Sequence, residues 1–402
     1  MNDGETIVRV AARGDGVTDG GRHAAYAAPG DLLRADGMVV PGPHHATPPC
    51  RHFPTCGGCQ LQHLDDESYA RFVTDRIAGA LAAQGLDAPL RPPHLSPPRS
   101  RRRATFHAER RGNAVVLGFS QASGTTLVDL VECHVVRPEI FGILKPLRAL
   151  LRDLIEPRRR IDIHVTLADQ GLDILVKGVS ADGLAFAERL PDFAARHGIA
   201  RFAVDDGYGP ETRWEPRPVT ISLGGVPVAL PHAAFLQATR DGEAMLVESV
   251  REAVGDAATI ADLFAGLGTF AFNLSGRIYA GEAGREPVLA LKAAASLAGR
   301  TIFADHRDLY RRPLTPGELD RFDALVIDPP RAGAREQVAS IAASKAQRVA
   351  YVSCNPSSFA RDTKILCEAG FAIDWIRPVG QFRWSTHVEL AAQLTRRSSQ
   401  PG

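Results

Sequence analysis

Apolar residues follow strand-like spacing in some segments and helical spacing in others, and the distribution of these segments divides the chain into three parts. In residues 1–46, short apolar runs such as 6–10 and 37–40 are separated by glycines. This pattern is typical of short β-strands joined by turns. The runs are too few to enclose a substantial core, so we interpret residues 1–46 as a short β-rich module.

Residues 47–245 mix helical and strand patterns. Apolar residues recur at helical spacing over 69–84 and stop at Gly85, which is typical of a helix and its C-terminal end. Strict alternation over 114–119 and 162–167 predicts antiparallel strands with one solvated face. We therefore expect a central α+β domain.

Residues 246–398 predict an open α/β domain of Rossmann-like type. Each of four apolar runs is followed by residues that can bind a ligand or take part in a reaction. Gly266-Leu267-Gly268 follows 259–264, Glu282 follows 277–281, Asp328 follows 324–327, and Cys354 follows 349–353. In open α/β sheets, ligands bind outside the carboxyl ends of the strands. These residues are therefore expected to share one edge of the sheet.

Composition limits the classes of partner. The 402 residues carry a formal net charge of +1, so any attraction to nucleic acid must come from local clusters. Arg99, Arg101, Arg102 and Arg103 form one such run, and a solvated charged face is the alternative interpretation.

No apolar run approaches the roughly 18 residues of a membrane span, and the first residues lack a signal-peptide pattern. We expect a cytoplasmic monomer without membrane contact.

Cysteine spacing predicts a metal site. Cys50, Cys56 and Cys59 follow the pattern C-x5-C-x2-C, Gly57 and Gly58 allow a tight turn between the last two, and Cys133 supplies a fourth thiol. Buried structural thiols are the alternative. The spacing alone does not distinguish tetrahedral zinc from an iron–sulfur cluster.

The Gly-rich turn and two carboxylates predict an adenosyl pocket. Gly266 and Gly268 let backbone N–H groups approach a ligand. Glu282, about twenty residues after Asp262, stands where the second strand of a nucleotide-binding unit offers a carboxylate to ribose, and Asp308 follows a third strand. Taken singly, either carboxylate could instead cap a turn.

The motifs together resemble those of the RNA uracil-C5 methyltransferases. The resemblance extends in order from Cys50 to Leu394, and its most specific motifs are Ser353-Cys354-Asn355-Pro356 and His387-Val388-Glu389. The other matching motifs are the four cysteines, Phe235-Leu236-Gln237, the run 262–268, the run 328–333 and Ala360-Arg361-Asp362.

The resemblance implies a class I methyltransferase domain that uses S-adenosyl-L-methionine, and a four-iron four-sulfur (4Fe-4S) cluster on Cys50, Cys56, Cys59 and Cys133. By the same resemblance, the cofactor and target pocket is lined by Gln237, Phe264, Thr269, Glu282, Asp308 and Asp328. Residues 1–46 are similar to a shortened OB or TRAM barrel, with an ordinary β-rich arm as the alternative.

Residue chemistry then suggests the mechanism. Uracil C5 is a poor nucleophile, so a thiolate must first add to C6, and we assign this step to Cys354. Glu389 is the matching carboxylate to remove the C5 proton after methyl transfer, and Asp328 is expected to hold the uracil edge. The target base must leave its stack to reach these groups.

The expected partner is RNA, with 23S rRNA preferred and tRNA possible. An exocyclic-amine methyltransferase is one alternative, but it gives Cys354 no role. A non-catalytic, metal-stabilised RNA-binding protein is another, but it leaves the adenosyl pocket unexplained.

Overall fold

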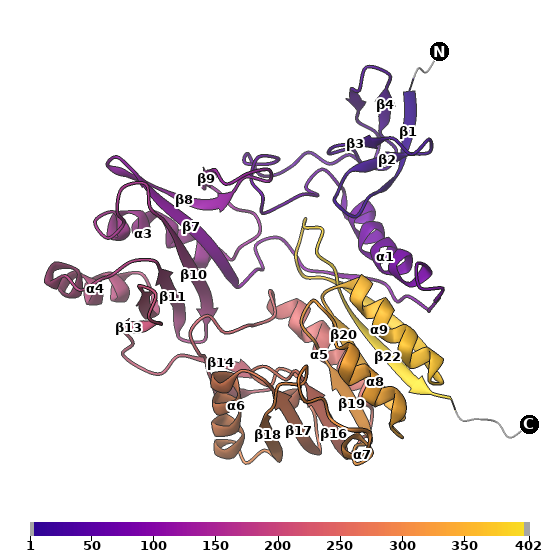
Figure 1. The fold of residues 1–402 in the computed structure, drawn as a ribbon. Coiled ribbons are helices and arrows are strands. Elements are labelled where there is room, and N and C mark those ends of the chain that lie inside the picture. Colours follow the sequence, from indigo (N-terminus) through magenta and orange to yellow (C-terminus); the bar gives the residue numbers. More distant parts are fainter. Residues whose placement is uncertain (1–3, 398–402) are drawn as a thin grey trace, which may run out of the picture.

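A computed structural model describes residues 4–397, which form three sheets and a separate β-hairpin. In Figure 1 a small β-module lies at the top, a central sheet at the left and a C-terminal sheet at the lower right. Within this described range, no helix combines the length and apolar character that a membrane span requires.

The N-terminal module is a five-stranded antiparallel sheet in the order β3-β2-β1-β4-β5. Its core is small, centred on Ile7 and Leu33, as the short apolar runs predicted. The OB or TRAM relationship stays a prediction. The strands are β1 (Gly4–Val10), β2 (Gly16–Thr18), β3 (His23–Ala24), β4 (Leu32–Arg34) and β5 (Val39–Val40).

The central part is a seven-stranded sheet in the order β13-β12-β11-β10-β7-β8-β9. From Ile161 to Val165 the residues of β10 alternate between buried and half-buried, as predicted for a one-sided strand, but Thr166 is buried and breaks the alternation. Helices α2, α3 and α4 contribute Ile140, Leu147 and Phe186 to its hydrophobic core. Its elements are β7 (Arg103–Arg111), β8 (Ala114–Ser120), β9 (Leu127–Asp129), α2 (Pro138–Gly142), α3 (Leu144–Leu151), β10 (Arg160–Ala168), β11 (Gly171–Lys177), α4 (Leu184–Arg196), β12 (Ile199–Asp205) and β13 (Glu211–Trp214).

The C-terminal part is an eight-stranded sheet in the order β18-β17-β16-β19-β20-β22-β21-β6. Strands β18, β17, β16, β19 and β20 are parallel, and β22 is antiparallel to both of its neighbours. From β16 the chain adds β17 and β18 on one side of the sheet, and then β19 and β20 on the other. The carboxyl ends of β16 and β19 therefore lie at a topological switch point. The elements are α5 (Arg240–Val254), β16 (Thr259–Leu263), η1 (Ala271–Asn273), β17 (Arg277–Glu282), α6 (Arg285–Leu297), β18 (Ile302–His306), α7 (Pro316–Leu319), β19 (Ala324–Ile327), α8 (Arg335–Ala343), β20 (Arg348–Ser353), α9 (Pro356–Glu368), β21 (Phe371–Gly380) and β22 (Glu389–Arg396).

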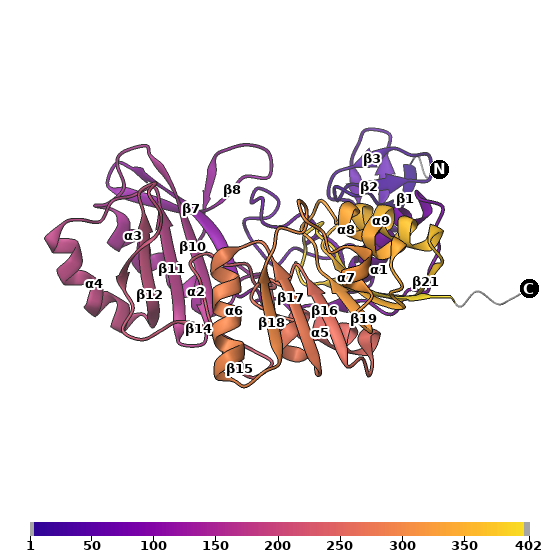
Figure 2. The ribbon, with the colours of Figure 1, turned by 60° about the horizontal axis from the view of Figure 1, so that its bottom comes forward.

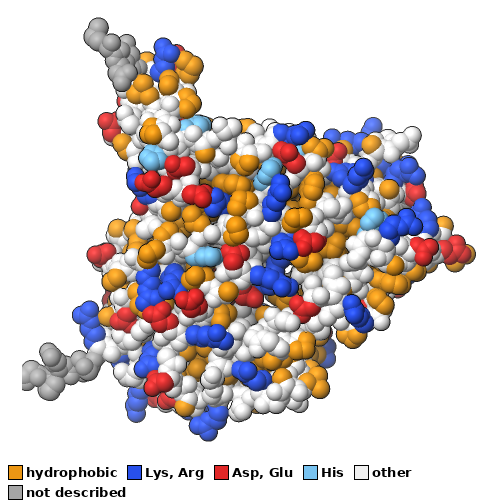
Figure 3. Space-filling model, turned by 180° about the vertical axis from the view of Figure 1, so that it is seen from behind, with side chains coloured by type: hydrophobic (Ala, Val, Ile, Leu, Met, Phe, Trp, Pro, Cys, Tyr) orange, Lys and Arg blue, Asp and Glu red, His pale blue; other side chains and the backbone are white. Residues whose placement is uncertain are grey.

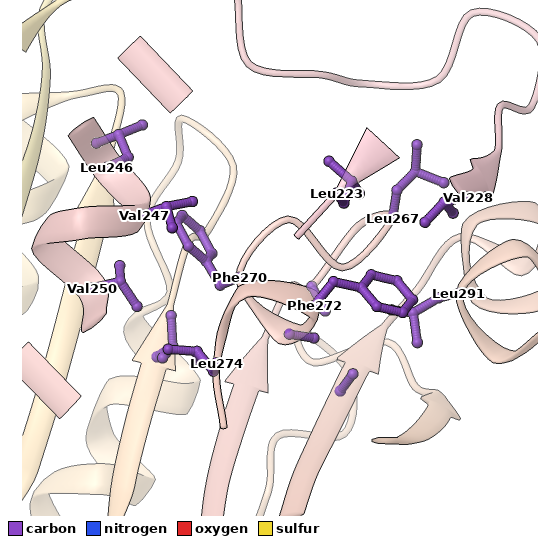
Figure 4. Packing of buried hydrophobic residues seen from close by; sticks show 14 of the residues in the cluster. Leu223, Val228, Leu246, Val247, Val250, Leu267, Phe270, Phe272, Leu274 and Leu291 are labelled. Atoms are coloured by element: carbon purple, nitrogen blue, oxygen red, sulfur yellow. The ribbon is translucent and has the colours of Figure 1, made fainter. Parts of the chain in front are cut away.

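A β-hairpin joins the central and C-terminal parts. Strands β14 (Thr220–Leu223) and β15 (Val226–Ala229) pack beside α6, and Figure 2 shows α6 standing between the two large sheets. In Figure 4, Leu223 and Val228 of the hairpin lie near Leu267 and Phe272. The hairpin therefore shields part of the core beneath the Gly-rich loop.

The predicted boundaries of the central domain differ from the packing in one region. Helix α1 (Asp66–Ala82) buries Phe72 and Ile77 in the same hydrophobic cluster as Phe359 of α9, and β6 (His94–Leu95) extends the C-terminal sheet beside β21. Residues 66–95 therefore belong to the C-terminal layers, although they precede the central sheet in sequence. Local periodicity identified the helix but could not show which sheet it covers.

The face seen in Figure 3 mixes Lys and Arg with Asp and Glu, and the N-terminal module extends above the rest of the molecule at the upper left. This mixture agrees with the near-zero net charge of the chain. Attraction of a polyanion would have to depend on particular basic residues rather than on the overall charge.

Candidate functional site

The strand register aligns four chain segments at one edge of the C-terminal sheet. Leu263 pairs with both Gly281 and Ile327, and Ile327 pairs with Tyr351. Phe264, Glu282 and Asp328 therefore lie at the carboxyl ends of adjacent parallel strands, as predicted.

Cys354 and Glu389 come together through the antiparallel pair β20 and β22. Their last paired residues are Ser353 and Leu390, and continuing this register by one residue sets Cys354 opposite Glu389. Glu389 is 4% exposed, and Cys354 is half-buried. Two residues distant in sequence thus become neighbours at the end of the sheet.

Burial and neighbouring negative charges raise the pKa values of the acidic groups at the carboxyl edge of the C-terminal sheet. Burial raises the pKa of Glu389 to about 8, with a further contribution from Asp328, and burial raises the pKa of Asp328 to about 7. The pKa of Cys354 is also raised, by burial and by the charges of Glu389 and Asp328, whereas Arg331 acts in the opposite direction. Several perturbed groups at one sheet edge indicate a reactive site.

The Gly-rich loop is held by the carboxylate at the end of β17. Gly266 and Gly284 donate backbone N–H bonds to Glu282, with N···O distances of 2.9 and 2.6 Å. A Cβ on Gly266 would meet no heavy atom within 4 Å, so the loop borders open space there. The predicted residues Gly268 and Thr269 continue the same loop, with Thr269 half-buried. The loop leaves room for a ligand beside Glu282.

Asp308 occupies the turn that follows β18. Its carboxylate accepts the backbone N–H of Tyr310 at 3.0 Å, so it caps that turn, as the alternative interpretation held. The Tyr310 ring lies 5.4 Å from the Phe264 ring, and its hydroxyl donates to the Gly333 carbonyl at 2.9 Å. Asp308 therefore orders a residue that connects the Gly-rich loop to the loop 328–333, which begins with Asp328-Pro329-Pro330 and is called the Asp-Pro-Pro loop below.

A buried carboxylate also fixes the Asp-Pro-Pro loop. Asp362 is fully buried and accepts the Ala334 N–H at 2.7 Å and the Tyr351 hydroxyl at 2.8 Å. Arg361 donates to Asp362 and to the Ala332 carbonyl at 2.9 Å. Arg361 thus orients the loop that begins at Asp328.

Gly333→Ala should destabilise this loop. Gly333 has φ +84°, and a Cβ there would lie 2.4 Å from an Asp362 carboxylate oxygen that is already hydrogen-bonded. Strain and overpacking should lower the free energy of unfolding by about 1–3 kcal/mol, measured by urea denaturation. Gly317→Ala is the control, because its Cβ would meet nothing within 4 Å. Equal midpoints for the two variants would contradict the clash.

Sequence reasoning missed two buried residues in this site. Asp262 is fully buried with one carboxylate oxygen unpartnered, and burial raises its pKa to about 8. Gln381 is 1% exposed and donates to both Gln237 and Glu389. Asp262 is the first residue of the run 262–268, which is one of the family-like motifs, so the sequence could have identified it as a site residue. Gln381 lies in none of these motifs.

The four predicted metal-ligand cysteines line one cavity. This cavity has a volume of about 620 Å³ and reaches from Cys50, Cys56, Cys59 and Cys133 to the segment 382–387 that precedes Glu389. Among residues 4–397, no three His, Cys, Asp or Glu side chains are grouped so that they could hold a metal ion. Burial raises the pKa of Cys59 to about 12, so without a bound metal this residue is a protonated thiol.

Comparisons with known proteins agree with these features. A family model described as tRNA (Uracil-5-)-methyltransferase matches residues 303–397. An uncharacterized RNA methyltransferase of Zymomonas mobilis is 51% identical over 393 residues, covering 97% of this chain and 99% of the relative. The 23S rRNA (uracil(1939)-C(5))-methyltransferase of Photorhabdus laumondii is 29% identical, covering 88% of this chain and 83% of the relative.

A solved structure shares the fold. The tRNA (uracil-54, C5)-methyltransferase of Pyrococcus abyssi, in complex with S-adenosyl-L-homocysteine, superposes with a TM-score of 0.75 and 21% identity, covering 98% of this chain and all of that one. The full-length relatives, the family model and the motifs at the sheet edge lead to one conclusion: the chain belongs to the RNA uracil-C5 methyltransferase family.

Proposed function

We propose that this enzyme transfers a methyl group from S-adenosyl-L-methionine to C5 of a uridine in RNA through a covalent adduct. The observation that carries the proposal is the position of Cys354 opposite Glu389 at the carboxyl edge of the sheet. An exocyclic amine carries its own nucleophile and would need neither a thiol nor a neighbouring base.

We assign the methyl donor to the open space beside Gly266 and Glu282. Glu282 uses one lone pair on each oxygen for the loop N–H groups, which leaves acceptor capacity for ribose hydroxyls. When bound, S-adenosyl-L-methionine supplies an electrophilic methyl on its sulfonium. The proposed cofactor residues are Gln237, Phe264, Gly266, Gly268, Thr269, Glu282, Asp308 and Asp328.

The proposed chemistry divides between two side chains. Cys354, after losing its proton, would add to uracil C6, and the electron pair of the C5–C6 double bond would attack the methyl from C5. The bond between the methyl and the donor sulfur breaks, and its electron pair stays on that sulfur. Glu389 then removes the C5 proton, the double bond re-forms, and the Cys354 sulfur leaves C6. Because Arg331 is the positive charge that opposes the raised pKa of Cys354, it favours the thiolate needed for the first step.

Basic and aromatic residues around the cavity support an RNA partner. The guanidinium of Arg103 lies 4.6 Å from the ring centre of Phe235, which is 63% exposed, and Arg101 lies 5.3 Å from that of Phe382. Arginine and exposed aromatic rings are the groups on which unpaired bases stack. This arrangement favours a flipped base over an intact duplex.

We also propose a 4Fe-4S cluster on Cys50, Cys56, Cys59 and Cys133. Four thiols facing one cavity are the donor set of such a cluster. In a cluster each thiolate binds a different iron, so the sulfurs need not converge on a single ion. Bound there, the cluster would tie the segment 50–59 to Cys133 near the central sheet and stabilise the cavity wall.

Iron binding gives a direct test of the cluster. Anaerobically purified protein should contain about four irons per chain, and Cys56→Ser should lose most of this iron and become poorly soluble because cluster binding contributes to folding. Cys367→Ser is the matched control, since Cys367 lies outside the cavity. Protein that holds one zinc and no iron would refute the cluster.

The proposed RNA is 23S rRNA, with tRNA as the second candidate. The name of the Photorhabdus relative, similar over most of both chains, supports the ribosomal substrate. Incubation with labelled S-adenosyl-L-methionine and total RNA, followed by nucleoside analysis, tests the reaction. Absence of labelled 5-methyluridine in every RNA fraction would refute the reaction, and label confined to tRNA would refute the choice of substrate.

A further inference from the structure

The side-chain amide of Gln381 connects two residues of the proposed site. Gln381 lies directly after β21, and its Nε2 donates to Gln237 Oε1 at 2.7 Å and to a carboxylate oxygen of Glu389. All three side chains are buried. The amide therefore links the proposed cofactor side of the site to the proposed base.

Backbone groups determine which way this amide faces. Its Oε1 accepts the N–H of Ala238 at 2.9 Å and is 3.4 Å from the N of Thr239. A backbone N–H can only donate, so the flipped amide would set two donors against each other. Nε2 is consequently held toward Glu389.

A fixed donor affects the two forms of Glu389 differently. A carboxylate oxygen accepts this hydrogen bond more strongly than a protonated carboxyl does, so the contact favours the ionised form. The charged or titratable groups that face Glu389 are Asp328, Cys354 and Arg103. Asp328 and burial oppose ionisation, and Arg103 favours it along with Gln381.

We propose that Gln381 is a positioning residue that orients the Glu389 carboxyl group and favours its ionised form, the form that removes the C5 proton. This inference rests on the proposed function of Glu389. Gln381 would act through Glu389, and the proposed role of Cys354 as the nucleophile stays the same.

Gly242 on α5 provides the space for Gln381. A Cβ on Gly242 would lie 2.7 Å from Gln381 Cβ, 3.1 Å from its Oε1 and 2.7 Å from Oγ1 of Thr239, which caps α5. Gly242→Ala should therefore displace the amide without removing it. The variant offers a second way to weaken the contact with Glu389.

The decisive experiment is a titration of Glu389 in the full chain. Carbon-13 NMR of glutamate-labelled protein would follow the carboxyl signal, assigned by its loss in Glu389→Gln. Gln381→Leu removes the donor, so the midpoint should rise by about one to two pH units, and Gly242→Ala should raise it less. Gln393→Leu, on β22 but bonded to Trp375, should leave the midpoint unchanged.

Activity provides a separate readout. In Gln381→Leu the methylated covalent complex should accumulate several-fold at pH 7 and decline at higher pH, where Glu389 ionises again. An unchanged midpoint or a wild-type level of complex would overturn the role of Gln381. Wild-type protein without methyl transfer would instead refute the proposed function, while the titration would still decide whether Gln381 favours the Glu389 carboxylate.

Discussion

Cys354→Ala is expected to abolish methyl transfer to RNA. Alanine offers no electron pair to uracil C6, so C5 is never activated, and the rate should fall by more than about four orders of magnitude. Transfer of labelled methyl to RNA measures the rate, and denaturing electrophoresis measures the covalent complex. Neither signal should exceed background.

Two controls separate this result from misfolding. Binding of S-adenosyl-L-homocysteine should persist, because Gly266 and Glu282 retain their mutual hydrogen bond. Cys367→Ala should keep near-wild-type activity, since Cys367 lies on α9 away from the sheet edge. A covalent RNA complex formed by Cys354→Ala would show that another residue is the nucleophile.

Strand positions could be predicted from sequence because their signals are local. Strands β19 and β20 are largely apolar runs that end at polar residues, as expected for strands covered on both faces, and β16 shares this character apart from Thr259 and Asp262. The motif at each end then located the sheet edge where Phe264, Asp328 and Cys354 come together. Helix α1 was predicted on similar grounds, but its association with α9 depends on packing between segments far apart in the chain.

The missed role of Gln381 has a different cause. A glutamine in a loop carries no periodicity, and its orientation depends on the backbone N–H of Ala238, far away in sequence. Asp308 shows the converse limit, because one carboxylate both follows β18, as the predicted nucleotide-binding pattern places it, and caps a turn. Sequence spacing locates such groups but does not reveal their hydrogen-bond partners.

Glu389→Gln should stop the reaction after methyl transfer. The amide has nearly the shape of the carboxylate but cannot accept the C5 proton, so Cys354 should remain bound to a methylated uracil. The complex should survive denaturation and carry the labelled methyl group, while turnover falls by about 10²–10⁴-fold.

The pH dependence of the wild-type enzyme tests the same assignment. The pKa of Glu389 is raised to about 8, so its basic form is scarce at pH 6 and increases as the pH rises toward 8. Proton removal should therefore quicken over this range, and the fraction of trapped complex should fall. In Glu389→Gln this fall should be absent, because the group that titrates has been removed. If the variant released its RNA with the wild-type pH profile, a different base would have to remove the C5 proton.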